Sequence, residues 1–131
     1  MSNNTPWPHF SETELTCHCG CNRQEMVPVF MEKLETLRVA YGKPLPINSG
    51  FRCPMHNAQA SQTGLSGPHT TGKAVDILVS GEDTYHLLGL AIKLGFTGIG
   101  LSQRGAHNSR FLHLDMIEPG PGRPRPFVWT Y

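Results

Sequence analysis

Two histidines and one aspartate have the residue types and positions of a metal site. His69 lies in a segment rich in Gly, Pro and Thr, Asp76 follows it inside an apolar run, and His113 lies in a second apolar run. Two imidazoles and a carboxylate are a common ligand set for catalytic zinc, with the fourth coordination position left open. We therefore predict that His69, Asp76 and His113 bind a zinc ion.

The two apolar runs are predicted strands, and strand geometry tells which side chains share a face. Side chains alternate between faces, so His113 and Asp115 point one way and their aliphatic neighbours the other. Asp76 likewise points away from Val75 and Ile77. If these strands are neighbours, Asp76 and His113 lie on the same side of the sheet. A carboxylate in such a run is costly to bury without a partner, although histidines in general are more often structural than metal-binding.

The surrounding pattern predicts an α+β fold, a small antiparallel sheet with flanking helices, because helices and strands mix without steady alternation. A capping-box turn begins at Ser11, and apolar residues at helical spacing follow Pro28. The predicted helices cover 28–41, 54–62 and a segment ending before Gly95, and the predicted strands cover 45–52, 74–79, 96–101 and 111–117. We expect one domain over residues 1–131, with an irregular arm at 1–10, which Trp7 and Phe10 pin to the body, and an irregular tail at 118–131.

Composition argues against several classes of partner. The formal charge of the 131-residue chain is +1 and charges of both signs are interleaved, so we expect no nucleic acid and no membrane as partner. No apolar run reaches the roughly 18 residues of a membrane helix. The N-terminus lacks a secretory signal, so we expect cytoplasmic synthesis without a signal peptide. We also expect a monomer.

Three separated motifs resemble one known group of enzymes. Gly67-Pro-His69-Thr-Thr-Gly-Lys-Ala-Val-Asp76 resembles the Ser-x-His-x-x-Gly-x-Ala-x-Asp motif of zinc D-Ala-D-Ala carboxypeptidases, phage endolysins and murein endopeptidases. The segment 111–115 resembles the second ligand strand of that group, and 49–57 resembles its Ser-Gly-(Tyr/Phe)-Arg-x-x-x-His-Asn segment. The group shares the hedgehog/D,D-peptidase fold, which the resemblance therefore implies here.

The resemblance also implies residue roles and a chemistry. His69, Asp76 and His113 would be the zinc ligands, and Arg52 would contact substrate or a developing oxyanion. Zinc with an open position lowers the pKa of bound water to about 7 and polarises a peptide carbonyl. A carboxylate would then accept the proton of the water and pass it to the leaving amine.

Two positions depart from the pattern of the group. The usual serine is Gly67, and the acid that many relatives carry three residues before the second zinc histidine is Arg110. Asp115 is the remaining carboxylate on the same face as His113, so we assign it as general base or as a partner of a zinc ligand. His107 and Glu118 are less favoured substitutes.

The cysteines form a second unusual cluster. Cys17, Cys19 and Cys21 alternate with other residues, and Cys53 follows the predicted substrate-binding Arg52. The sequence leaves three states open: free or buried thiols, a disulfide between the N-terminal segment and Cys53, or a structural zinc site. Its further ligand could be Cys53, His18 or His56.

The leading interpretation is a zinc peptidase that cuts stem or cross-bridge peptides of peptidoglycan and is encoded by a phage or prophage. It would reach the cell wall after holin release or as a virion component. The sequence does not indicate which peptide bond is cleaved. An alternative is a non-catalytic zinc-binding module of the same fold, which the missing acid at Arg110 favours. A weaker third class is an interaction protein with merely structural histidines.

Overall fold

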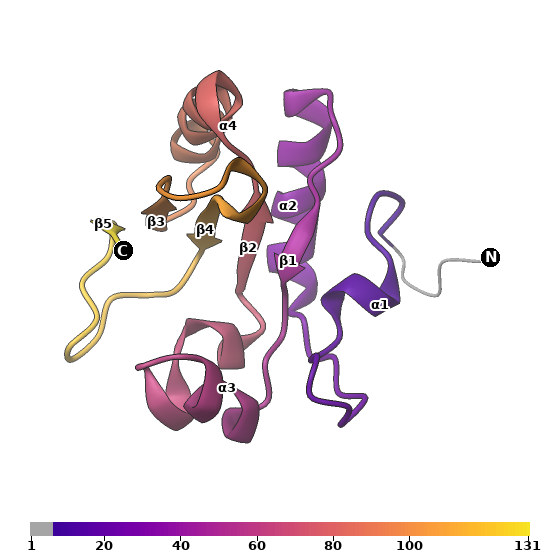
Figure 1. Ribbon diagram of the computed structural model, residues 1–131, viewed down its shortest axis with the longest axis vertical. Coiled ribbons are helices and arrows are strands. Elements are labelled where there is room, and N and C mark those ends of the chain that lie inside the picture. The colour runs from indigo at the N-terminus through magenta and orange to yellow at the C-terminus, as the bar shows by residue number, and fades with distance from the viewer. Residues whose placement is uncertain (1–6) are drawn as a thin grey trace.

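Five strands form one sheet in the order β1-β2-β4-β3-β5 (Figure 1). The computed structural model describes residues 7–131. The strands are β1 Ile47–Ser49, β2 Ala74–Leu78, β3 Gly98–Ser102, β4 Phe111–Asp115 and β5 Phe127–Thr130. The α-helices are α1 Glu12–Leu15, α2 Pro28–Tyr41, α3 Pro54–Ala60 and α4 Gly81–Lys93, and the 3-10 turns are η1 Gly64–Ser66, η2 Pro68–Thr71 and η3 His107–Ser109. The predicted α+β class is confirmed.

The C-terminal segment differs from its prediction. Residues 127–130 form β5, which pairs with β3 in parallel, whereas the other neighbouring strands pair antiparallel. The prediction of an irregular tail is therefore wrong for these residues, and the sheet is not purely antiparallel. The reason is visible in the alternation of Phe127, Trp129 and Tyr131 with smaller residues, a strand pattern that the preceding Pro/Gly-rich stretch obscures.

Local signals explain where the helices begin and end. In α1 the Ser11 hydroxyl accepts from the Glu14 backbone N–H and the Glu14 carboxylate accepts from the Ser11 N–H, which is the predicted capping box. Pro28 occupies the first turn of α2, where its missing N–H costs nothing, and Gly42 ends that helix in the left-handed conformation.

The hydrophobic core lies between the sheet and the helices α2 and α4, which contact each other (Figure 1). The aliphatic faces of the two central strands supply the sheet side of this core, as the alternation predicted. Its fully buried members include Phe30, Leu34, Leu37, Val75, Ile77, Leu87, Leu112 and Leu114. Phe10 is also buried and Trp7 packs against the core, while residues 1–6 of the predicted arm lie outside the described residues.

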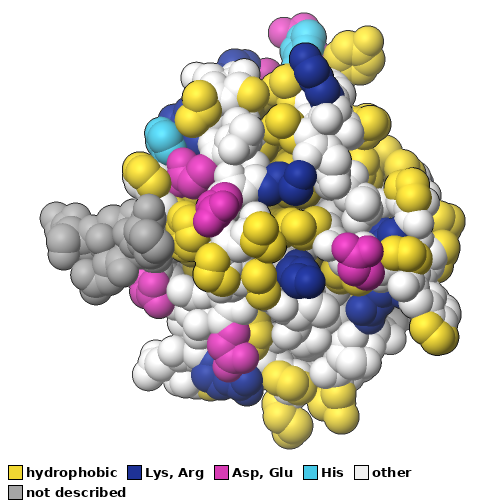
Figure 2. Space-filling model, turned by 180° about the vertical axis from the view of Figure 1, so that it is seen from behind, with side chains coloured by type: hydrophobic (Ala, Val, Ile, Leu, Met, Phe, Trp, Pro, Cys, Tyr) yellow, Lys and Arg dark blue, Asp and Glu magenta, His cyan; other side chains and the backbone are white. Residues whose placement is uncertain are grey.

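The surface has no strong charge asymmetry on the face turned away from the view of Figure 1. Figure 2 shows basic and acidic side chains scattered among hydrophobic ones on that face. Within residues 7–131, no helix has the length and the apolar character needed to cross a membrane.

Candidate metal centre

Sheet register brings the first two candidate ligands together. Asp76 on β2 lies directly opposite His113 on β4, so both side chains leave the sheet on the same face. The intervening aliphatic side chains point to the other face and are buried in the core. The predicted sharing of a face by Asp76 and His113 is therefore confirmed.

The third candidate ligand comes from the turn that precedes β2. His69 lies in η2, which Pro68 begins and Gly72 ends with a φ of +73°. A β-carbon at Gly72 would overlap the carbonyl oxygen of Glu25, so both the φ angle and the space require glycine there. The His69 ring is buried, and its Nδ1 lies 2.8 Å from the carbonyl oxygen of Gly50. This contact directs Nε2 toward the sheet.

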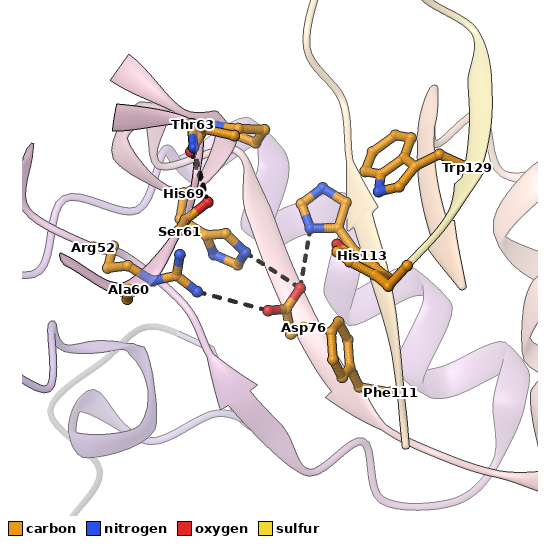
Figure 3. A pocket seen from close by; sticks show the side chains of 11 residues that line it. Arg52, Ala60, Ser61, Thr63, His69, Asp76, Phe111, His113 and Trp129 are labelled. Atoms are coloured by element: carbon orange, nitrogen blue, oxygen red, sulfur yellow. Dashed lines mark hydrogen bonds and ion pairs between the residues drawn. The ribbon is translucent and has the colours of Figure 1, made fainter. Parts of the chain in front are cut away.

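One nitrogen of each histidine faces the same carboxylate oxygen (Figure 3). His69 Nε2 lies 3.2 Å and His113 Nδ1 lies 3.0 Å from Asp76 Oδ1. Donor atoms that share a tetrahedral zinc ion at about 2.0 Å would be roughly 3.3 Å apart. The chemistry and spacing of these three buried donors, all within 4.8 Å of one another, therefore fit a zinc ion.

The electrostatics of the cluster favour the charged forms. Burial alone would raise the pKa of Asp76, but its hydrogen bonds with His113 and His69 hold that pKa well below the usual range. Burial would lower the pKa of His113, but hydrogen bonds to Asp115 and Asp76 raise it instead. Asp76 is thus a carboxylate at neutral pH, which is the form that binds a metal, whereas His113 must release its proton when it binds one.

Asp115 lies behind His113, away from the open side of the site. Its Oδ2 lies 2.8 Å from His113 Nε2, and its two oxygens accept from Arg125 Nε at 2.9 Å and Nη2 at 2.8 Å. These bonds outweigh burial and lower the pKa of Asp115 to about 2. A general base must reach the water that it deprotonates, and Asp115 is fully buried. The geometry does not support Asp115 as a base; it fits the partner of a zinc ligand, the other role left open by the sequence.

Small residues on β3 make room for this arrangement. Gly98 lies opposite Asp115 and Gly100 lies opposite His113. A β-carbon at Gly98 would overlap the Asp115 carboxylate, and one at Gly100 would meet the indole of Trp129 at 2.6 Å. Trp129, on β5, lies with its ring centroid 5.1 Å from that of His113. The two glycines therefore permit the carboxylate and the indole to sit over the sheet.

Arg52 lies beside the cluster and is held by its own motif. Its Nη1 donates to Asn57 Oδ1 at 3.0 Å, its Nη2 donates to Ser49 Oγ at 3.1 Å, and Nη2 lies 3.8 Å from Asp76 Oδ2. The fully buried Asn57 in turn donates to Thr63 Oγ1 at 2.8 Å and to the carbonyl oxygen of Gly64 at 2.5 Å. The segment 49–57 thus fixes both the guanidinium and the following loop.

The glycine that departs from the usual motif has a local explanation. A β-carbon at Gly67 would overlap the side chain of Thr63 and meet the amide of Asn57 at 2.7 Å. The Thr63 side chain therefore fills the space that a serine at position 67 would need. Its hydroxyl is also the group that accepts from the Asn57 amide.

A cavity of about 380 Å³ opens over the three candidate ligands. Its lining residues are Arg52, Ala60, Ser61, Thr63, Pro68, His69, Asp76, Phe111, His113, Trp129 and Tyr131. Among these described residues, Asp76 supplies the only carboxylate side chain. The Arg110 guanidinium donates to the carbonyl oxygen of Gly105, and neither His107 nor Glu118 lines the cavity.

Several residues of the site were not predicted from the sequence, and the most consequential are Trp129, Tyr131 and Arg125. Trp129 and Tyr131 line the cavity, and Arg125 pairs with Asp115. The aromatic alternation in 127–131 was the available signal for the first two. Arg125 had none, because nothing in the Pro/Gly-rich stretch distinguishes it from the neighbouring Arg123, and both resemble solvated charges.

Two buried imidazoles and a carboxylate at the floor of a cavity, on the polar face of an α+β sheet, define a candidate centre for a metal-dependent hydrolase. Comparison with protein families matches residues 8–115 to Peptidase M15, and the chain belongs to this family of zinc-dependent metallopeptidases. A search of curated proteins by sequence gave no match. The matched range contains all three candidate ligands and Arg52, and it ends before β5.

Proposed function

We propose that this protein is a zinc peptidase that hydrolyses peptide bonds in bacterial peptidoglycan, with His69, Asp76 and His113 as zinc ligands. The observation that carries the proposal is the convergence of these three buried side chains at the floor of a cavity, beside a guanidinium held in place. Membership of Peptidase M15 supports the reaction class. The substrate class rests on the resemblance to endolysins and D-Ala-D-Ala carboxypeptidases.

When bound, zinc supplies a Lewis acid that polarises a peptide carbonyl and activates water. The protein's own residues provide orientation. The Gly50 carbonyl and the Asp115 carboxylate fix the two imidazole rings, each through the nitrogen that does not face Asp76. Because both rings are fixed, the fourth coordination position of the zinc would face the cavity.

Arg52 is the substrate-binding residue in this proposal. Peptidoglycan peptides carry carboxylates, and a guanidinium binds a carboxylate through two parallel N–H···O bonds. Ser49 and Asn57 hold the guanidinium, so little side-chain freedom is lost when substrate binds. Phe111 and Trp129 give the cavity apolar walls that exclude water from the bound peptide.

A second candidate function is a non-catalytic zinc-binding module. The observation that favours it is the lack of a carboxylate side chain other than Asp76 among the described residues of the cavity. Proton transfer would then have no carboxylate partner close to the metal. This candidate predicts zinc binding and peptidoglycan binding without release of peptides.

Purified sacculi incubated with the protein separate the two functions. We expect the wild type to release peptides that mass spectrometry identifies, and a chelator to stop the release. His69→Ala should abolish release and lower zinc content, whereas His86→Ala, which alters an exposed histidine on α4, should change neither. Full activity of His69→Ala contradicts the site assignment, and a zinc-loaded wild type without activity favours the module.

The proposal includes how the protein meets its substrate. We place its action at the cell wall after holin-mediated release or as part of a virion, and we expect it to act as a monomer. Analytical ultracentrifugation of the purified protein tests the monomer, and a stable dimer contradicts it.

A further inference from the structure

The four cysteines come together at a place away from the candidate metal centre. Cys17 and Cys53 are buried and Cys19 and Cys21 are exposed, and all four are free thiols. Their sulfur atoms all lie within 4.8 Å of one another. Three come from one short loop after α1, and the fourth precedes α3, so the cluster joins two segments far apart in the sequence.

The sulfur distances suit a shared ion better than a covalent bond. Cys17 Sγ lies 3.5 Å from Cys19 Sγ, and Cys19 Sγ lies 3.6 Å from Cys53 Sγ. A disulfide would bring two sulfurs to about 2.05 Å. Four thiolates about 2.3 Å from a tetrahedral zinc ion lie roughly 3.8 Å apart, which is close to the observed spacing.

The loop is folded so that alternate residues present their sulfurs to one point. The Cys17 N–H donates to the carbonyl oxygen of Arg23 at 2.9 Å and closes the loop. Within this loop, Gly20 has a φ of +93° and Asn22 a φ of +61°, so both residues adopt the left-handed conformation. Glycine and asparagine are the residues that adopt this conformation most easily.

Backbone N–H groups donate to the two buried sulfurs. The Cys53 N–H donates to Cys17 Sγ at 3.3 Å, and the His56 N–H donates to Cys53 Sγ at 3.4 Å. Backbone N–H groups that donate to the ligand atoms are the outer shell expected around a metal site.

We propose that Cys17, Cys19, Cys21 and Cys53 hold a second, structural zinc ion. Such a site joins the loop 17–23 to the segment that carries Arg52. That segment is also tied to the candidate metal centre, because the Arg52 N–H donates to the carbonyl oxygen of His69 at 3.1 Å. The structural zinc therefore fixes the backbone from which Arg52 reaches the cavity.

Zinc content per chain after dialysis against a weak chelator tests this site independently of activity. The wild type should retain two zinc ions and His69→Ala should retain one. Cys19→Ser/Cys21→Ser, which replaces two exposed thiols and leaves the core intact, should also retain one. Thr13→Ser is the control, since it alters an exposed residue of α1 just before the loop, and it should retain two.

The results separate the failure of this proposal from the failure of the proposed function. One zinc in the wild type and none in His69→Ala overturns the cysteine site and leaves the peptidase centre standing. One zinc in both proteins overturns the peptidase centre and supports the cysteine site. A double cysteine variant with unchanged zinc content overturns the cysteine site.

A second measurement uses a protein with all four cysteines, so its result does not depend on whether a cysteine variant folds. X-ray absorption at the zinc edge of His69→Ala should show four sulfur neighbours at about 2.3 Å. Only nitrogen and oxygen neighbours, or a loss of free thiols to a disulfide in the purified protein, would overturn the proposal.

Discussion

Replacing Asp115 with asparagine tests its assignment as a positioning residue. The substitution keeps the shape of the side chain and removes its charge. Two groups lose their anionic partner: the imidazole of His113 at Nε2 and the guanidinium of Arg125, whose side chain is 5% exposed. Asparagine offers one acceptor oxygen where Asp115 uses both, so it cannot replace all the bonds that His113, Arg125 and the Ile117 N–H make to the carboxylate.

The structure allows the size of both effects to be worked out. Removing one partner of a buried ion pair typically costs about 3–5 kcal/mol. Arg125 retains its bond to the carbonyl oxygen of Pro124 and its position over the Trp129 ring, so we expect a loss near the lower end, about 3 kcal/mol. Loss of the partner of a metal-binding histidine lowers affinity by about 10–100-fold, or roughly 1.4–2.8 kcal/mol.

Two assays and one companion variant separate these effects. Denaturant unfolding gives the free energy of unfolding, and titration against a competing chelator gives the zinc affinity. Arg125→Gln should lower stability comparably but change zinc affinity by less than about tenfold, because the bond between Asp115 and His113 remains. In the double variant, stability should partly recover while zinc affinity stays low.

One result would refute this reasoning. If Asp115→Asn retains the zinc affinity and the stability of the wild type but loses turnover, then Asp115 acts on the proton of the reaction and not on His113.

Three further predictions follow from local geometry. Gly98→Ala should reduce zinc affinity and stability because its β-carbon would meet the Asp115 carboxylate. Its control is Gly89→Ala on α4, where the space around the residue is open, and this change should stabilise the protein by about 0.5–1 kcal/mol. Equal unfolding midpoints for the two variants would contradict the close approach. Trp129→Ala should raise KM for peptidoglycan fragments more than it lowers kcat, as measured by steady-state kinetics, and an unchanged KM would remove the indole from the substrate site. Ser11→Ala should cost about 1 kcal/mol by denaturant unfolding, through loss of the capping box, and no loss would show that α1 is held by packing alone.

The faces of the two central strands were predictable because they follow from the alternation of apolar and polar residues along each strand. Alternation along two apolar runs determines that Asp76 and His113 point away from the core, and the burial of Val75 and Leu112 on the other face confirms that part. The actual register, Asp76 opposite His113, needed the structure, since nothing in either run specifies which residue faces which.

The surroundings of the site were harder to predict because they depend on contacts distant in sequence. The cation that pairs with Asp115 comes ten residues later from an irregular stretch, and its choice depends on how β5 returns to the sheet. The role of Gly67 depends on the side chain of Thr63, which lies outside the motif 67–76. Position in the chain cannot identify a general base, because access to the cavity decides whether a carboxylate can serve.

The position of β5 at the edge of the sheet divides the cavity into two parts of different origin. The floor, with His69, Asp76 and His113, lies within the range matched to Peptidase M15, whereas Trp129 on β5 and Tyr131 just after it follow that range. An edge strand has only one neighbour, and here that neighbour is β3. One wall of the cavity is therefore attached to the rest of the sheet through β3 alone, yet it touches the floor directly, because the Trp129 ring lies against His113.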